Sequence, residues 1–192
     1  GAAALYRDRY ASLAARMRVI ENGYDEETFS AVQAGGARVP LASGRLTLLH
    51  SGVVYPEERD PRQFIAALAL LKADGTAAAV PFAVRFRASS QDALLADLAR
   101  QHGVSNLVEL LPAVPYAQAL DEMLRADALL VLQAANCNQQ IPAKVYEYLR
   151  ACRPVLGFTD AVGDTAATLR AAGVDAIAPL DDAAAKWVEL AK

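Results

Sequence analysis

The sequence is poor in the residues on which several classes of protein depend. Its 192 residues include two cysteines, two histidines and one tryptophan. Cys137 and Cys152 have neither the spacing of a zinc site nor that of a disulfide framework, which argues against a metal module or a disulfide-stabilised secreted domain. Thiols without such partners fit a reducing compartment, so we expect a cytoplasmic protein.

Long apolar runs and an excess of basic residues are also missing. The 19 lysines and arginines are outnumbered by 22 acidic residues, and a net charge of −3 does not favour binding to nucleic acid or an anionic membrane. No apolar run approaches the roughly 20 residues of a membrane-spanning helix. The opening residues, GAAALYRDRY, lack the layout of a signal peptide and begin within a structural element. We therefore expect a piece of a longer protein.

What the chain does contain is an alternation of short apolar runs with amphipathic stretches. A composition of 54% hydrophobic and 21% charged residues is typical of a globular domain. The run ALLVLQ is apolar almost throughout, as expected of a central parallel strand covered on both faces. Strands are expected at 46–52, 82–86, 107–111, 128–133, 154–158 and 175–179, and helices from 60, from 89, at 116–125, 142–152 and 165–172, and from 181.

This order of elements predicts an α/β fold, with a Rossmann-like doubly wound parallel sheet of about six strands and helices on both faces. The stretch AGGARVPLAS at 34–43 is rich in turn-forming residues and separates the opening segment from the regular part. We therefore expect residues 1–40 to be an interdomain connection and residues 41–192 to be the Rossmann-like domain.

The most informative stretch runs from Leu132 to Phe158, where a predicted strand is followed by a polar loop and a helix that opens at Pro142. Ligands of open α/β sheets bind at the carboxyl ends of the strands. The unpaired N–H groups and the positive dipole at the start of this helix suit a diphosphate. Glu147 can accept hydrogen bonds from the two hydroxyls of a ribose, and Lys144 lies three residues before it.

This stretch resembles the donor-binding region of retaining, group 1 (family 4-like) glycosyltransferases of the GT-B fold. Those enzymes carry two acidic residues separated by seven others, followed by small residues and Pro-Val. Glu147 matches the second acid, and RACRPVLGF matches the downstream part. Gln139 stands where the family has the first acid, which contacts the donor sugar. The motif IPAKVYEYL is similar to that of bacterial polysaccharide-type transferases.

Two further stretches resemble the same family in the same order. RVIENGYDEETF at 18–29 is similar to the element that enters the C-terminal domain, and the sequence at 48–68 is similar to the first strand and its glycine-containing loop. That loop usually reads Gly-Arg, whereas here Val53 follows Gly52. Arg59 stands near the position of a later basic residue and is the candidate diphosphate contact.

The resemblance implies the donor-binding domain of a metal-independent, hexosyltransferase-type enzyme that moves a sugar from a UDP- or GDP-sugar to a glycan or lipid-linked acceptor. The donor is a substrate, and no cofactor is implied. The acceptor would bind to the enzyme's own N-terminal domain, outside this chain, so the chain alone should bind nucleotide weakly without transferring sugar. The full-length enzyme would be cytoplasmic, with peripheral association at the inner face of the membrane left open.

The resemblance also implies the site residues. The implied catalytic residues are Gln139, Glu147 and Arg59. The implied donor-binding residues are Gly52, Val53, Leu111, Val114, Asn138, Ile141, Pro142, Ala143, Lys144 and Glu147, with the loop from Leu111 to Val114 facing the nucleobase.

Other functions stay open at this point. Half of a GT-B-like epimerase or phosphorylase would share the architecture, although an epimerase needs a histidine with an acidic partner and His50 alone is near the site. A non-catalytic nucleotide- or glycan-binding module would tolerate Gln139 and Val53 in place of the usual residues. An unrelated Rossmann-like protein would carry a G-x-G-x-x-G motif after the first strand, and HSGVVY does not match it.

Structural roles compete with the functional ones at each candidate. Glu147, Lys144 and Arg59 can each be plain surface residues. Gly52 can be required only for the positive φ of a turn. His50 has apolar neighbours in the sequence, and we expect it to be buried and hydrogen-bonded rather than to act as a base.

Overall fold

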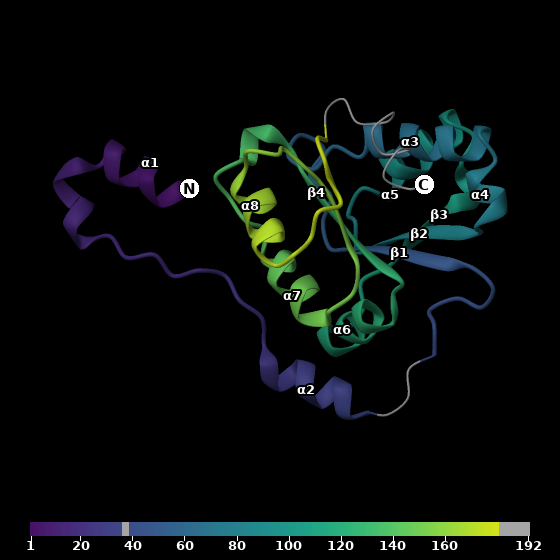
Figure 1. Cartoon of the computed structure of the whole chain (residues 1–192), viewed down its shortest axis with the longest axis horizontal. Helices are drawn as coiled ribbons and strands as arrows, with labels where there is room; N and C mark the ends of the chain where they lie inside the picture. The colour runs from purple at the N-terminus through teal and green to yellow at the C-terminus, as the bar shows by residue number, and fades with distance from the viewer. Residues whose placement is uncertain (36–38, 181–192) are drawn as a thin grey trace.

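The sheet has the predicted number of strands and the predicted directions. The computed structural model describes residues 1–35 and 39–180 (Figure 1). Within them, all neighbouring strands are parallel, in the order β3-β2-β1-β4-β5-β6. The strands are β1 (Leu46–Ser51), β2 (Phe82–Arg87), β3 (Val108–Leu111), β4 (Ala128–Gln133), β5 (Val155–Thr159) and β6 (Ile177–Ala178). The doubly wound α/β fold predicted from the sequence is confirmed.

Helices cover both faces of the sheet (Figure 1) because successive residues of a strand point to opposite sides. In β1, Leu48 belongs to the core on one face and Leu49 to the core on the other. The first face carries α3 (Arg62–Ala73), α4 (Thr76–Ala79) and α5 (Asp92–Gln101), and the second carries α6 (Tyr116–Arg125), α7 (Ala143–Ala151) and α8 (Asp164–Ala171). Two short 3₁₀ turns, η2 (Ser105–Leu107) and η3 (Ala135–Cys137), lie in the connections. The helix predicted from residue 181 lies outside the described residues.

The helices α3 and α5 begin close to the positions that capping residues in the sequence predict. A carboxylate oxygen of Asp60 accepts a hydrogen bond from the Arg62 N–H (3.0 Å), and Ser89 Oγ accepts one from the Gln91 N–H (3.0 Å). α5 ends beside Gly103, whose φ of +67° lies in the left-handed region that glycine favours. These local signals set the starts of α3 and α5 and the end of α5.

The segment before the sheet contributes a helix to the packed body. α1 (Ala2–Arg9) and η1 (Ala11–Arg16) have no buried residue, and an extended stretch leads from them to α2 (Glu26–Ala34) (Figure 1). Phe29 of α2 is fully buried in the core that α6 and α7 share. Residues 1–40 therefore include a helix that packs on the Rossmann-like domain. None of the described helices is both long and apolar enough to cross a membrane.

Candidate functional site

The loops after β1 and β4 lie at the point where the strand order reverses. β1 pairs with β2 on one side and with β4 on the other. The chain leaves β1 toward α3 on one face and leaves β4 toward α7 on the other, and ligands of open α/β sheets bind at such a switch point, outside the carboxyl ends of the strands. The Ala134 N–H donates to the Glu58 carbonyl (2.7 Å) and joins the two loops. α7 starts here, and its N-cap residue, Pro142, makes no side-chain hydrogen bond to the first N–H groups of the helix.

Gly52 brings the loop after β1 against α7. Its φ is +100°, a conformation that other residues rarely adopt. The preceding Ser51 N–H donates to the hydroxyl of the buried Tyr148 on α7 (2.8 Å), and the Gly52 N–H donates to the Arg87 carbonyl of β2 (2.8 Å). A Cβ atom at Gly52 would lie 3.5 Å from Nζ of Lys144. The turn therefore needs glycine for its backbone and lies directly against the lysine.

Lys144 packs against this turn and forms a hydrogen bond inside the protein. Its Nζ lies 2.9 Å from Nε2 of His50, and Nδ1 of His50 lies 3.0 Å from the Leu130 carbonyl oxygen. Because a carbonyl only accepts, we assign the ring proton to Nδ1, so Nε2 accepts from Lys144. Burial lowers the pKa of Lys144 to about 7, and burial followed by the charge of Lys144 lowers the pKa of His50 well below its usual value. Lys144 is not a plain surface residue, and His50 is buried and hydrogen-bonded as predicted.

Arg59 lies near Lys144 and adds a second cation. One guanidinium nitrogen donates to the Val53 carbonyl (2.8 Å), and the group lies 4.8 Å from the centre of the Tyr55 ring. Its Nε is buried and has no hydrogen-bond partner among the described residues. Neither Arg59 nor Lys144 forms a salt bridge with a carboxylate in the part of the chain that the structure describes. Two neighbouring, partly desolvated basic side chains that form no salt bridge among the described residues suit the binding of an anion.

Glu147 points toward the start of α6. Its Oε1 accepts a hydrogen bond from the hydroxyl of Tyr116 (2.8 Å). Burial and this hydrogen bond raise the pKa of Tyr116 to about 12. Tyr116 follows the loop at 111–114 by two residues, so it links Glu147 to the loop that the resemblance assigns to the nucleobase. Glu147 is partly buried and is engaged by a neighbouring side chain, unlike a freely solvated helical glutamate.

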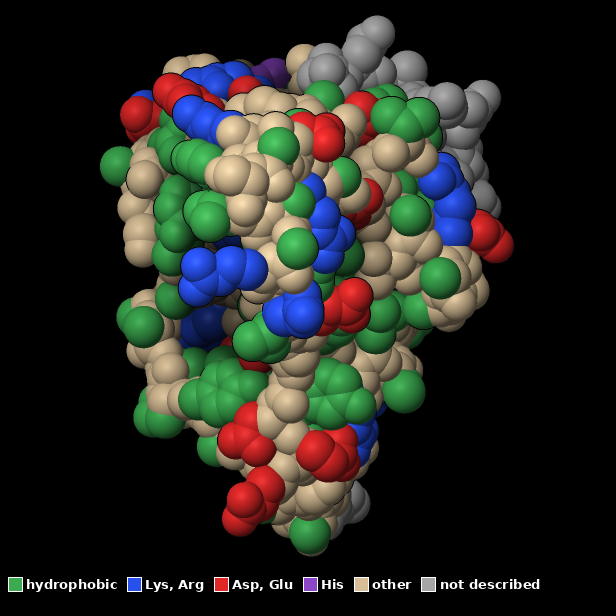
Figure 2. Space-filling model, turned by 90° about the vertical axis from the view of Figure 1, so that its left-hand side faces the viewer, with side chains coloured by type: hydrophobic (Ala, Val, Ile, Leu, Met, Phe, Trp, Pro, Cys, Tyr) green, Lys and Arg blue, Asp and Glu red, His purple; other side chains and the backbone are tan. Residues whose placement is uncertain are grey.

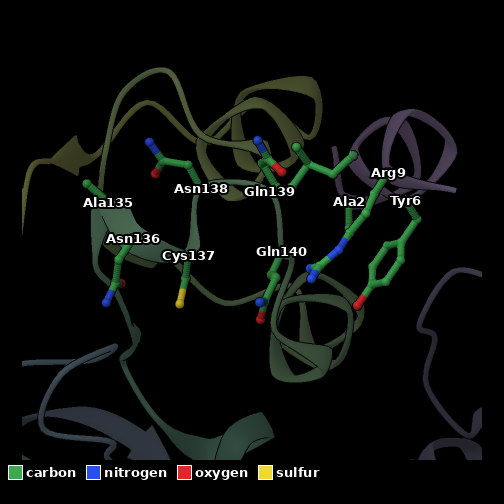
Figure 3. A pocket seen from close by; sticks show the side chains of 10 residues that line it. Ala2, Tyr6, Arg9, Ala135, Asn136, Cys137, Asn138, Gln139 and Gln140 are labelled. Atoms are coloured by element: carbon green, nitrogen blue, oxygen red, sulfur yellow. The ribbon is translucent and has the colours of Figure 1, made fainter.

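Gln139 lies in the β4–α7 loop, before the start of α7 and next to α1. Residues 135–140 and α1 enclose a pocket of about 460 Å³, and the side chains of Tyr6 and Arg9 extend toward it from α1 (Figure 3). Lys and Arg side chains gather across the middle of the face that carries α1 (Figure 2). The predicted residues thus fall into three groups and a pair. One group lies at the switch point (Gly52, Val53, Arg59, Lys144, Glu147), one lines the pocket (Asn138, Gln139), and Ile141, Pro142 and Ala143 lie between them in the chain. Leu111 and Val114 lie at the carboxyl end of β3.

Three residues shape the site although the sequence did not mark them as site residues. Tyr116 holds Glu147, and Tyr148 holds the Gly52 turn. Arg87 donates to the Pro112 carbonyl (2.6 Å) and pairs with the buried Glu122, which fixes the loop after β3. The run FAVRFRA carries two arginines, Arg85 and Arg87, in an otherwise apolar strand, which was a usable signal for Arg87. Nothing near the two tyrosines in the sequence indicates their partners.

The sequence matches no protein-family model, and no curated protein matches it significantly. The structure is similar to that of WaaG, a glycosyltransferase involved in lipopolysaccharide biosynthesis, with a TM-score of 0.67 and 18% identity over 97% of this chain and 49% of WaaG. It is also similar to Anabaena HepE, whose structure is a complex with UDP, with a TM-score of 0.61 and 17% identity over 93% of this chain and 46% of HepE.

A third neighbour is AviGT4, a glycosyltransferase involved in avilamycin A biosynthesis. It has a TM-score of 0.52 and 18% identity over 79% of this chain and 42% of AviGT4. The chain spans about half the length of WaaG and HepE. At these identities the likeness concerns the fold, and the chain has the Rossmann-like fold of one half of a GT-B glycosyltransferase.

Proposed function

We propose that this chain is the donor-binding domain of a glycosyltransferase that moves a sugar from a nucleotide-diphosphate sugar to a glycan or lipid-linked acceptor. One observation carries the proposal. Lys144 and Arg59 lie together beside the start of α7, and neither forms a salt bridge with a carboxylate among the described residues. A diphosphate would supply the missing negative charge. The fold shared with WaaG, and with HepE in its complex with UDP, supports the same assignment.

The residues at the switch point fit the chemical task of this reaction. Sugar transfer requires stabilisation of the charge that develops on the departing phosphate. The first N–H groups of α7, from Ala143 onward, carry the positive end of the helix dipole, and Lys144 and Arg59 add positive charge. Glu147 would accept hydrogen bonds from the ribose hydroxyls, and Gln139 would contact the sugar. Because the chain itself supplies this positive charge, we propose a metal-independent hexosyl transfer.

The acceptor-binding half belongs, in this proposal, to another domain of the same enzyme. This chain matches about half the length of WaaG and HepE, which supports that division. We therefore expect the isolated chain to bind nucleotide without transferring sugar. The resemblance of IPAKVYEYL to bacterial polysaccharide-type enzymes points to a cytoplasmic role in polysaccharide biosynthesis, with a UDP- or GDP-sugar as donor.

A non-catalytic nucleotide-binding module is the alternative that a specific observation favours. Val53 and Gln139 both replace residues that the catalytic family uses, and Gln139 lies in the wall of the pocket beside α1, whose lining includes neither Lys144 nor Arg59. Half of an epimerase fits less well. His50 would have to exchange protons with a substrate, but it is fully buried and both of its ring nitrogens have partners within the protein.

Titration calorimetry with UDP, GDP and ADP tests the proposal. We expect one of these nucleotides to bind with a dissociation constant between about 1 µM and 1 mM, which corresponds to roughly 4–8 kcal/mol. In Glu147→Gln, which keeps the side-chain volume and a hydrogen bond to Tyr116 but loses the charge, the affinity should fall about tenfold or more because charged hydrogen bonds to the ribose are lost.

Glu27→Gln is the matched control. Glu27 is an exposed glutamate on α2, and its replacement should leave the affinity unchanged. No measurable binding of any of the three nucleotides, or equal affinities in the two variants, would contradict the proposal. Tight binding of NAD instead would assign the domain to another class of Rossmann-like protein.

A further inference from the structure

The environment of Lys144 Nζ is unusual for a lysine. The titratable and charged groups that face it are His50 of β1, Arg59 of the β1–α3 loop and Glu147 on the next turn of α7. Glu147 is bound to Tyr116, and among the described residues the lysine has no salt bridge. A neutral imidazole is therefore the direct partner of a lysine amine that is partly removed from water.

The imidazole in turn is held in one orientation. His50 is fully buried, packs against Phe86 with ring centres 5.7 Å apart, and has its Nδ1 directed at the Leu130 carbonyl. Nε2 is thus presented as an acceptor at a fixed point below the Gly52 turn. His50 receives no substrate in this arrangement, but it determines where Nζ of Lys144 lies.

We propose that His50 positions Lys144 Nζ in the diphosphate site and that binding of a nucleotide sugar is accompanied by uptake of one proton from solvent by the Lys144 amine. This inference rests on the proposed donor-binding function. The uncharged amine of the free protein accepts a proton and becomes an ammonium group, which the bound diphosphate then stabilises. In the free protein the low pKa of about 7, caused mainly by burial, leaves about nine-tenths of the lysines uncharged at about pH 8.

Calorimetry in two buffers of different ionisation enthalpy measures the proton directly. The probes are UDP-glucose and GDP-mannose, because a sugar diphosphate lacks the terminal phosphate group that titrates at about pH 6 in UDP or GDP. At about pH 8 we expect uptake of about 0.8 proton per ligand, and a loss of affinity of about 20-fold between about pH 6.5 and 8.5. Lys144→Arg, which stays charged, should bind with almost no uptake, whereas Lys72→Arg, at the far end of α3, should match the unmodified protein.

The positioning role of His50 is tested by two variants. Gln keeps an acceptor near the position of Nε2, and Leu removes it. We expect His50→Gln to bind within about threefold of the unmodified protein and His50→Leu to bind about tenfold more weakly, because the amine loses its fixed partner. Equal affinities for the two variants would overturn the positioning role.

A ligand-free measurement separates this inference from the proposed function. Unfolding returns Lys144 to an ordinary pKa, so between about pH 7 and 8.5 the unfolded chain binds more protons and the free energy of unfolding should rise with pH. The rise should be lost in Lys144→Met. A flat profile in the unmodified protein, or ligand binding without proton uptake, would overturn the inference while leaving donor binding intact. A rising profile without binding of any nucleotide sugar would instead contradict the proposed function, and the proton-uptake inference with it.

Discussion

Among single residues, Gly52 combines a backbone requirement with a position beside the proposed ligand. Its φ of +100° is strained for any residue with a Cβ atom, and that atom would lie 3.5 Å from Lys144 Nζ. We predict that Gly52→Ala lowers the free energy of unfolding by roughly 1–2 kcal/mol and weakens nucleotide binding about tenfold. Urea denaturation and titration calorimetry measure the two effects.

Gly75 offers a control with a similar backbone. Its φ is +85°, and a Cβ atom there would meet nothing within 4 Å. Gly75→Ala should cost a similar amount of stability and leave nucleotide affinity unchanged. If both variants bind equally well, Gly52 serves the turn alone.

The chemistry of individual residues was partly readable from the sequence. Glu147 and Lys144 were marked by their place near the start of a helix that follows a strand, where ligands bind in this type of fold, and Gly52 was marked by the resemblance of its loop to that of the transferase family. The bond between His50 and Lys144 joins residues 94 positions apart, and it depends on how α7 packs on β1. No local pattern encodes that packing, so the low pKa of the lysine could not be predicted.

Among the elements, α2 has only a weak sequence signal for a helix, and its packing on the domain holds it in place. It buries a single residue, Phe29, and Arg150 of α7 binds Glu26 through two hydrogen bonds of 2.6 Å while lying 5.2 Å from the centre of the Phe29 ring. We predict that Phe29→Ala lowers the free energy of unfolding by about 3–5 kcal/mol, measured by urea denaturation.

Leu13→Ala, on the exposed η1 turn, is the matched control for this prediction. Leu13 is 47% exposed, and its removal should change stability by less than about 0.5 kcal/mol. Equal stability of the two variants would show that α2 is not part of the folded domain. The strands, in contrast, were predicted within one or two residues because buried parallel strands are continuous apolar runs bounded by turn-forming residues.

For the whole molecule, the reversal of strand order between β1 and β4 determines where a ligand can bind. The two connections leave these strands toward opposite faces, and the turn at Ser51 and Gly52 packs against α7 at this switch point. The sequence predicted the alternation of elements and the doubly wound sheet that produces this switch point. It did not predict that Gln139 would lie with α1 at a separate pocket, because that depends on where the opening segment folds back.

A crystal structure of this chain with bound UDP or GDP, whichever binds more tightly, tests the assignment most directly. We predict phosphate oxygens at about 3 Å from the first N–H groups of α7 and from Lys144 Nζ, with the ribose hydroxyls on Glu147. A nucleotide bound elsewhere, for example in the pocket beside α1, with Glu147 still bonded only to Tyr116, would contradict it.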